Sequence, residues 1–123
     1  MNFLSSLSPH VHWGLRLSLA ATFLYHGLGK WPPAAFAESF DMNLLVVWAV
    51  IIAEVIAGLA LIIGAFGKDM LTRLAGLIVI VIMIGAIVLV HGQNGWNVMN
   101  GGMEFQVLML AVGLYFAAKG NNA

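Results

Sequence analysis

The sequence has no cysteine and very little charge. Among its 123 residues only 8% are Asp, Glu, Lys or Arg, and five basic residues balance five acidic ones. Without cysteine there is no disulfide, no thiol nucleophile and no thiolate ligand for a metal ion. Balanced charge gives no basic patch of the kind that binds nucleic acid. The sequence also lacks a phosphate-binding glycine loop, a nucleophile elbow and a zinc-protease motif. We therefore expect no nucleic-acid partner and no metal site, and no catalytic residue can be assigned.

Apolar residues fill the chain instead, at 62% of its length. They gather in four long stretches that are close to the roughly 20 residues a helix needs to cross a bilayer, the last being short. The stretches are too long for strands and lack a two-residue alternation. A mildly amphipathic segment, 33–43, predicts a short helix in the membrane interface. The sequence thus predicts an all-α fold, a single four-helix transmembrane bundle over 1–123, with helices at about 13–31, 44–65, 74–91 and 105–118.

The basic residues predict how the bundle is oriented. With four crossings the N-terminus, the second loop and the C-terminus share a side. That side holds Lys68, Arg73 and Lys119, with Arg16 close by, whereas Lys30 alone lies on the other. The positive-inside rule then places both termini in the cytoplasm. No basic residue precedes the first apolar stretch, so we expect a retained helix and not a signal peptide. The predicted location is the cytoplasmic (inner) membrane of a prokaryote.

Ionisable residues interrupt the apolar stretches. A charge inside a spanning helix costs about 2.5–3.5 kcal/mol on insertion scales, so it normally faces the protein interior and has a partner. Glu54 lies roughly 15 Å below the outer end of its helix, near the middle of the bilayer. Its expected partner is Lys30 or His26 from the outer side, or Arg16 from the inner side. The candidates for ligand binding in an outer pocket are His26, Lys30, Glu54, His91 and Glu104; those for structural charge pairing are Arg16, Glu54 and Arg73.

Spacings of three and four residues predict the inward face of each helix. Alternatives remain for the charged residues: those near helix ends could extend to the interface or cap a helix, and Glu54 could hold two helices together. The predicted inward faces are Arg16, Ala20, Phe23, Gly27 and Lys30 on the first helix; Ile51, Glu54, Gly58 and Leu61 on the second; Leu77, Ile80, Ile84, Ile87 and His91 on the third; and Glu104, Leu108, Ala111 and Tyr115 on the fourth.

Four segments resemble the DoxX family of small four-helix membrane proteins. Arg16–Lys30, which ends in Gly-Leu-Gly-Lys, resembles the family's opening signature, and Glu54–Gly64 its Glu-x-x-x-Gly-x-x-Leu segment. Thr72–His91 resembles the third helix of the family, and Gly101–Phe105 the start of the fourth, with phenylalanine in place of an aromatic hydroxyl. The family takes its name from a subunit of an archaeal complex that passes electrons from thiosulfate to quinone, and relatives are associated with oxidative-stress complexes. The resemblance thus implies quinone-linked redox work.

Three functions fit these observations. The leading hypothesis is a membrane subunit whose outer polar pocket binds a quinone-like or other small amphipathic molecule, with no intrinsic cofactor. The rival is a non-catalytic assembly subunit, whose charges pair to hold helices or dock a partner. A small-solute or proton pathway is a weaker alternative. His26 and His91 are only a weak signal for axial haem ligands. Expected partners are the lipid bilayer, other membrane or redox subunits and a second copy of the chain; whether the chain is an enzyme is left open.

Overall fold

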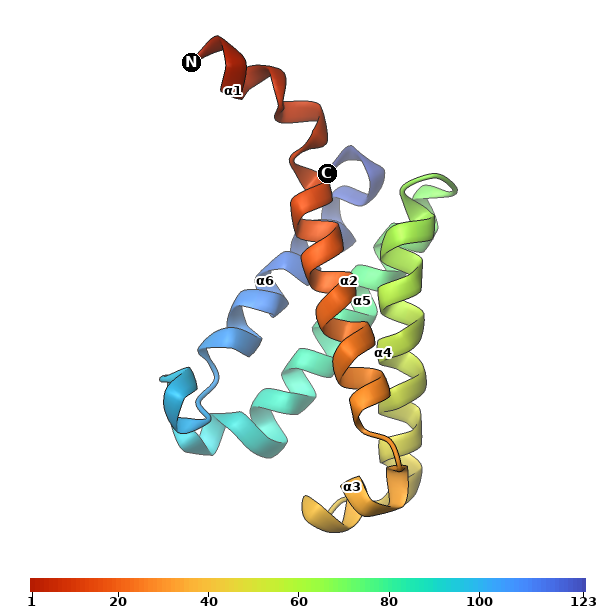
Figure 1. Ribbon diagram of the computed structural model, residues 1–123, viewed down its shortest axis with the longest axis vertical. Coiled ribbons are helices and arrows are strands. Elements are labelled where there is room, and N and C mark those ends of the chain that lie inside the picture. The colour runs from red at the N-terminus through yellow and green to blue at the C-terminus, as the bar shows by residue number, and fades with distance from the viewer.

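The computed structural model describes residues 1–123, and the chain is all-α, as the sequence predicted. The chain forms four long α-helices and two short ones, and Figure 1 shows how they are arranged. A π-helical turn, Ile87–His91, extends the fifth helix, and short 3-10 turns occupy Ser8–His10, Gly92–Asn94, Val98–Asn100 and Gly120–Asn122. The α-helices are α1 (Asn2–Ser6), α2 (His12–Gly29), α3 (Pro33–Ser39), α4 (Leu44–Gly64), α5 (Asp69–Ala86) and α6 (Glu104–Lys119).

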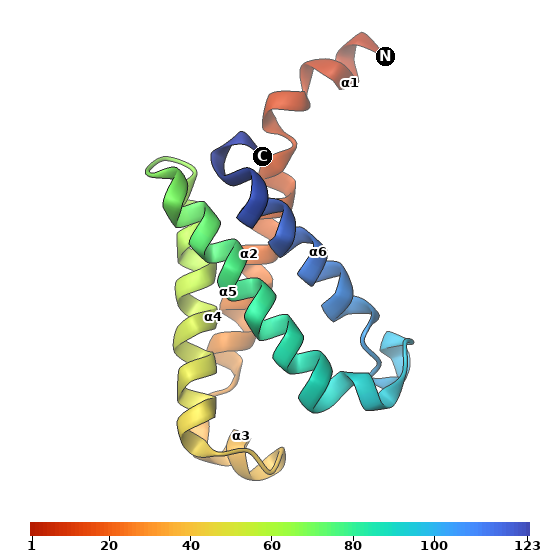
Figure 2. The ribbon, with the colours of Figure 1, turned by 180° about the vertical axis from the view of Figure 1, so that it is seen from behind.

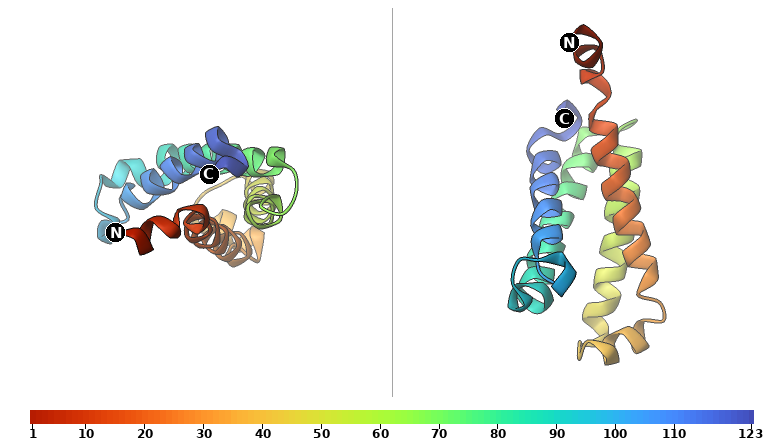
Figure 3. Two further views of the ribbon diagram at one scale, coloured as in Figure 1. Left: turned by 90° about the horizontal axis from the view of Figure 1, so that it is seen from above. Right: turned by 60° about the vertical axis from the view of Figure 1, so that its left-hand side comes forward.

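The four long helices pack in chain order. The main contacts join α2 to α4, α4 to α5 and α5 to α6, whereas α2 and α6 touch little. Both termini and the α4–α5 turn lie at one end of the molecule (Figures 1 and 2). We call this the closed end; it contains Arg16, Gly64 and Asn121. Toward the other end the α2–α4 pair diverges from the α5–α6 pair (Figure 3). This open end contains Lys30 and α3.

Small residues sit where the helices cross most closely. A Cβ added to Gly76 of α5 would lie 2.5 Å from the Ala117 nitrogen and 2.6 Å from the Gly113 carbonyl oxygen of α6. At the crossing of α2 and α4, a Cβ on Gly58 would lie 2.7 Å from the Leu24 side chain. Such contacts are typical of helices that associate inside a bilayer, where close backbone packing replaces the hydrophobic effect.

The outer surface of the bundle is strongly apolar. Large apolar side chains are exposed, such as Leu45 on α4, Val81 on α5 and Phe66 in the turn between these two helices. Two helical segments, Leu44–Gly64 and Asp69–Asn94, are long and apolar enough to cross a membrane. A soluble monomer rarely exposes apolar surface on this scale.

The third long helix begins earlier than the sequence predicted. Helix 74–91 was expected after a charged turn, but α5 begins at Asp69, so Arg73 lies inside it. Asp69 and Arg73 are four residues apart and form an ion pair of 2.6 Å across one helical turn. Such a pair supports a helix, and an acidic residue in the first turn complements the helix dipole. The predicted start of this helix was wrong because the prediction took the charged residues next to the apolar stretch to lie outside the helix.

The predicted inward faces are confirmed for α2 and α4 and wrong for α5 and α6. Leu77 of α5 is 50% exposed and Leu108 of α6 is 62% exposed. Large apolar residues can face outward, because small residues are needed where backbones meet. Buried residues of α2 are Arg16, Leu19, Ala20, Phe23 and Gly27; of α4, Val47, Ile51, Glu54, Ala57, Gly58, Leu61 and Gly64; of α5, Thr72, Ala75, Gly76, Val79 and Met83; and of α6, Met109, Gly113 and Phe116.

Candidate functional site

A cavity of about 190 Å³ lies between the four long helices, toward the open end. All four helices or their extensions contribute to its wall, so it forms only when the bundle is assembled. Four of the five predicted ligand-binding residues line it, together with seven that were not predicted. The lining residues are Thr22, Phe23, His26, Lys30, Glu54, Met83, Ala86, His91, Phe105, Gln106 and Met109.

An ion pair forms the charged wall of the cavity. The Lys30 ammonium donates to a carboxylate oxygen of Glu54 at 2.7 Å and to the His26 carbonyl at 3.1 Å. Glu54 is 5% exposed. A Cβ on Gly27 would lie 3.1 Å from the Glu54 Cβ, so α2 and α4 are close enough there for Lys30, almost one turn further, to reach across. The ammonium also lies 5.5 Å from the centre of the Phe36 ring of α3, a favourable cation–π distance.

His91 lines the cavity, and one of its imidazole nitrogens contacts the loop before α6. Its Nδ1 lies 2.8 Å from the Gly101 carbonyl oxygen. A carbonyl can only accept, so Nδ1 carries the proton, and Nε2 of the neutral ring is left as an acceptor. His91 closes the π-helical turn Ile87–His91, and such turns are frequent at functional sites. The histidine is therefore held in one tautomer by the loop before α6.

Gln106 is the site residue that sequence reasoning missed. It lines the cavity, and its Oε1 is buried without a hydrogen-bond partner. A buried polar atom of this kind costs about 1–3 kcal/mol and is rare in folded proteins. A signal was present: Gln106 is the one amide side chain in the apolar stretch 105–118, three residues before the buried Met109. A search restricted to ionisable residues overlooks it.

Glu104 lies outside the cavity, unlike the sequence prediction. Its Oε1 accepts a hydrogen bond from the Val98 amide at 2.6 Å, so the side chain stabilises the 3-10 turn Val98–Asn100 in the loop before α6. His26 lines the cavity but is itself exposed at the open end. No three His, Asp or Glu side chains gather closely enough to hold a metal ion.

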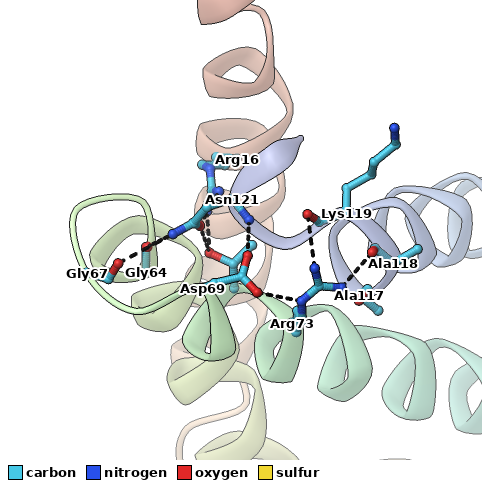
Figure 4. Close-up of polar contacts among 10 residues, drawn as sticks. Arg16, Gly64, Gly67, Asp69, Arg73, Ala117, Ala118, Lys119 and Asn121 are labelled. Carbon is cyan, nitrogen blue, oxygen red and sulfur yellow. Dashed lines mark hydrogen bonds and ion pairs between the residues drawn. The ribbon is translucent and has the colours of Figure 1, made fainter.

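A second polar cluster, at the closed end, surrounds Arg16 (Figure 4). Arg16 is 1% exposed, and it does not pair with Glu54. Its Nη1 donates to the Leu61 carbonyl at 2.7 Å and to the Thr72 hydroxyl at 3.0 Å, and its Nη2 donates to the Asn121 Oδ1 at 3.1 Å. Asn121 in turn donates to the Gly64 carbonyl at 2.9 Å. Arg16 and Asn121 thus satisfy free carbonyls in the last turn of α4.

Arg73 caps α6 in the same way. Besides its ion pair with Asp69, it donates to the carbonyls of Ala117 at 3.1 Å and Ala118 at 2.6 Å, at the C-terminus of α6 (Figure 4). A cation at a helix C-terminus also complements the helix dipole. Arg16 and Arg73 have all their hydrogen-bond partners inside the protein, so the closed end joins α2, α4, α5 and α6.

The model of the DoxX family matches residues 12–92, from the start of α2 through the π-helical turn. This chain belongs to the DoxX family. It is accordingly a membrane protein, and its exposed apolar helices agree with that assignment. The match includes Arg16, Lys30, Glu54 and His91, whereas Gln106 lies beyond it. Neither a curated protein nor a solved structure matches the chain.

Proposed function

We propose that this DoxX protein crosses the cytoplasmic membrane of a prokaryote as a four-helix bundle, with the closed end in the cytoplasm. Lys68, Arg73 and Lys119 all lie at the closed end, near Arg16, whereas Lys30 alone lies at the open end. The positive-inside rule favours this orientation. Helix α2 is less apolar than α4 and α5, and Arg16 within it and Lys30 directly after it both have partners inside the bundle. The cavity then opens toward the outer leaflet.

We further propose that the cavity binds a quinone or a similarly small amphipathic molecule. The observation that supports this most is the Gln106 Oε1, buried and unpartnered in a cavity that also contains the Lys30–Glu54 pair. A bound hydroxyl would give that oxygen its missing donor, and Lys30 is placed to donate to a carbonyl. A quinone carries a carbonyl on each of two opposite sides of its ring, which can accept from Lys30, and a quinol carries a hydroxyl on each, which can donate to the Gln106 oxygen. The same cavity can therefore hold both redox forms.

Reduction of a quinone consumes two electrons and two protons, and oxidation of the quinol releases them. In this proposal the electrons come from or go to a partner redox subunit. The chain itself binds the ring and exchanges protons at the ring oxygens. His91 accepts a proton at Nε2, and His26, which lies near the mouth, exchanges protons with water. Glu54 holds the Lys30 ammonium in place.

The test is equilibrium binding of ubiquinone and menaquinone to the purified protein in lipid nanodiscs. Gln106→Leu and Glu54→Gln are each expected to weaken binding about tenfold or more, the loss expected for a hydrogen bond to a buried group. Glu38→Gln is the matched control, because Glu38 is exposed on α3 at the same end and undergoes the same change of charge. No saturable binding by the wild-type protein would refute the proposal.

The competing function is a non-catalytic assembly role. At the closed end, two residues support that role. Arg16 and Arg73 have internal partners and so act as structural groups. An assembly role gives no reason for one cavity to contain both an unpartnered Gln106 oxygen and an ion pair. If Gln106→Leu leaves binding unchanged and raises stability, the cavity is simply an imperfectly packed interior and the assembly role stands.

A further inference from the structure

An apolar groove of about 290 Å³ lies between α4 and α5 and meets the polar cavity. On α4 it is lined by Val46, Val50 and Glu54, which lie on successive turns of one face and span about 12 Å. Gly85 and Leu89 belong to the opposite wall. Glu54 is the one ionisable residue of the groove, and it stands at the deep end, where the lining is shared with the cavity.

The groove and the cavity adjoin each other at three residues. Glu54, Met83 and Ala86 belong to both the cavity and the groove. The cavity contains the polar groups, such as Lys30, Glu54 and Gln106, whereas the groove is apolar apart from Glu54. A molecule with a polar head and one flexible hydrocarbon chain matches this division of polarity.

We propose that the α4–α5 groove holds the hydrocarbon tail of the ligand whose polar ring occupies the cavity. This inference rests on the proposed function and narrows its ligand class to quinones that have a tail. The tail leaves the ring at Glu54, passes Ala86, and follows Val50 and Val46 toward the open end. Small polar solutes would fill the cavity alone and leave the groove to lipid.

A second groove lies between α2 and α6 and is the alternative route. It measures about 200 Å³, is lined by residues such as Leu15, Ser18 and Val112, and shares Thr22, Phe105 and Met109 with the cavity. It runs from the cavity toward the closed end, away from the charge pair. The α4–α5 groove reaches Glu54 itself and is larger, so we assign the tail to it.

The test compares two probes and three leucine variants. The probes are the ubiquinone ring without a side chain and the same ring with a decyl chain. Gly85→Leu fills the α4–α5 groove, and a Cβ at Gly85 meets no atom within 4 Å, so the backbone need not move. Ser18→Leu fills the α2–α6 groove. Gly14→Leu is the control, because a Cβ at Gly14 also meets nothing within 4 Å and Gly14 lines neither groove.

Gly85→Leu is expected to weaken binding of the decyl probe about tenfold, the size of a typical overpacking penalty. Binding of the bare ring should stay unchanged, as should binding of both probes to the Ser18→Leu and Gly14→Leu variants. Each probe is compared with itself between variants, so its partition into lipid cancels.

Four outcomes overturn the inference. If Ser18→Leu and not Gly85→Leu weakens the decyl probe, the tail follows the α2–α6 groove. If Gly85→Leu weakens the binding of both probes equally, or of neither probe, the groove does not hold the tail. If mass spectrometry finds a co-purifying phospholipid that Gly85→Leu releases without changing decyl binding, the groove holds structural lipid. If the bare ring and the decyl probe both fail to bind the wild-type protein, the proposed function itself is wrong.

Discussion

The two ends of this bundle both bury charge, but they treat it differently. At the closed end Arg16 donates to a backbone carbonyl, a hydroxyl and an amide oxygen, and it lines neither the polar cavity nor the two grooves. At the open end Glu54 pairs with Lys30 beside a cavity that also contains an unpartnered Gln106 oxygen. A buried charge alone therefore does not mark a functional site. Free space next to an unsatisfied polar atom is what distinguishes the open end.

Arg16→Gln should give the largest loss of stability. It removes a buried cation and takes one donor each from the Leu61 carbonyl, the Thr72 hydroxyl and the Asn121 Oδ1, which keeps only the Thr72 hydroxyl as a donor. The free energy of unfolding should therefore fall by about 2–4 kcal/mol. The measurement is reversible unfolding in mixed micelles. Lys68→Gln is the control; Lys68 is exposed at the same end, and its loss should change stability by about 0.5 kcal/mol or less. If the two variants lose the same free energy of unfolding, the hydrogen bonds of Arg16 do not stabilise the closed end.

Gly76→Ala should follow in size. Its Cβ would meet backbone atoms of α6 at 2.5 Å and 2.6 Å, so α5 and α6 must separate, which should cost about 1–3 kcal/mol. Gly85→Ala is the matched change on the same helix, in open space, and should stabilise the helix by up to about 1 kcal/mol. Thermal unfolding of both variants gives the comparison. If Gly76→Ala and Gly85→Ala change the thermal stability equally, the close approach of α5 and α6 at Gly76 does not limit the size of the residue there.

Glu54→Gln should have the smallest effect on stability. Lys30 has a side-chain exposure of 15%, so it can turn toward the mouth of the cavity, and the free energy of unfolding should fall by only about 1 kcal/mol. The double variant Lys30→Met with Glu54→Gln should recover most of that stability without recovering quinone binding. A loss as large as that of Arg16→Gln would make the ion pair a structural element like the closed end.

The first half of the fold was easier to predict than the second. On α2 and α4 the ionisable residues Arg16 and Glu54 mark the inward face, because a charge in a bilayer must turn inward. On α5 and α6 the predicted faces were drawn through large apolar residues such as Leu77 and Leu108, which are exposed. In a membrane protein a leucine is as well placed against lipid as inside, so apolar periodicity did not identify the buried face. The buried faces of α5 and α6 instead contain the small residues Gly76 and Gly113, where the two helices meet.

For the site, the sequence supplied the ionisable residues but not their partners. It offered Lys30, His26 and Arg16 as partners of Glu54, and the structure brings Lys30 to it. The sequence prediction placed Glu104 in the pocket. In the structure Glu104 lies outside it and accepts a hydrogen bond from the Val98 amide. Gln106 and Asn121 were overlooked, because an uncharged amide gains its importance only from the buried groups around it.

The sequence by itself determined that the chain is helical, where its long apolar segments lie and which charges need partners. These follow from local composition and from the cost of burying charge. The tertiary structure alone decided which partner each charge received, which faces of α5 and α6 are buried, and that the bundle is closed at Arg16 and open at Lys30. Those features depend on how near two helices can approach, and that distance is set by pairs of residues far apart in the chain, such as Gly76 with Gly113 and Gly27 with Glu54.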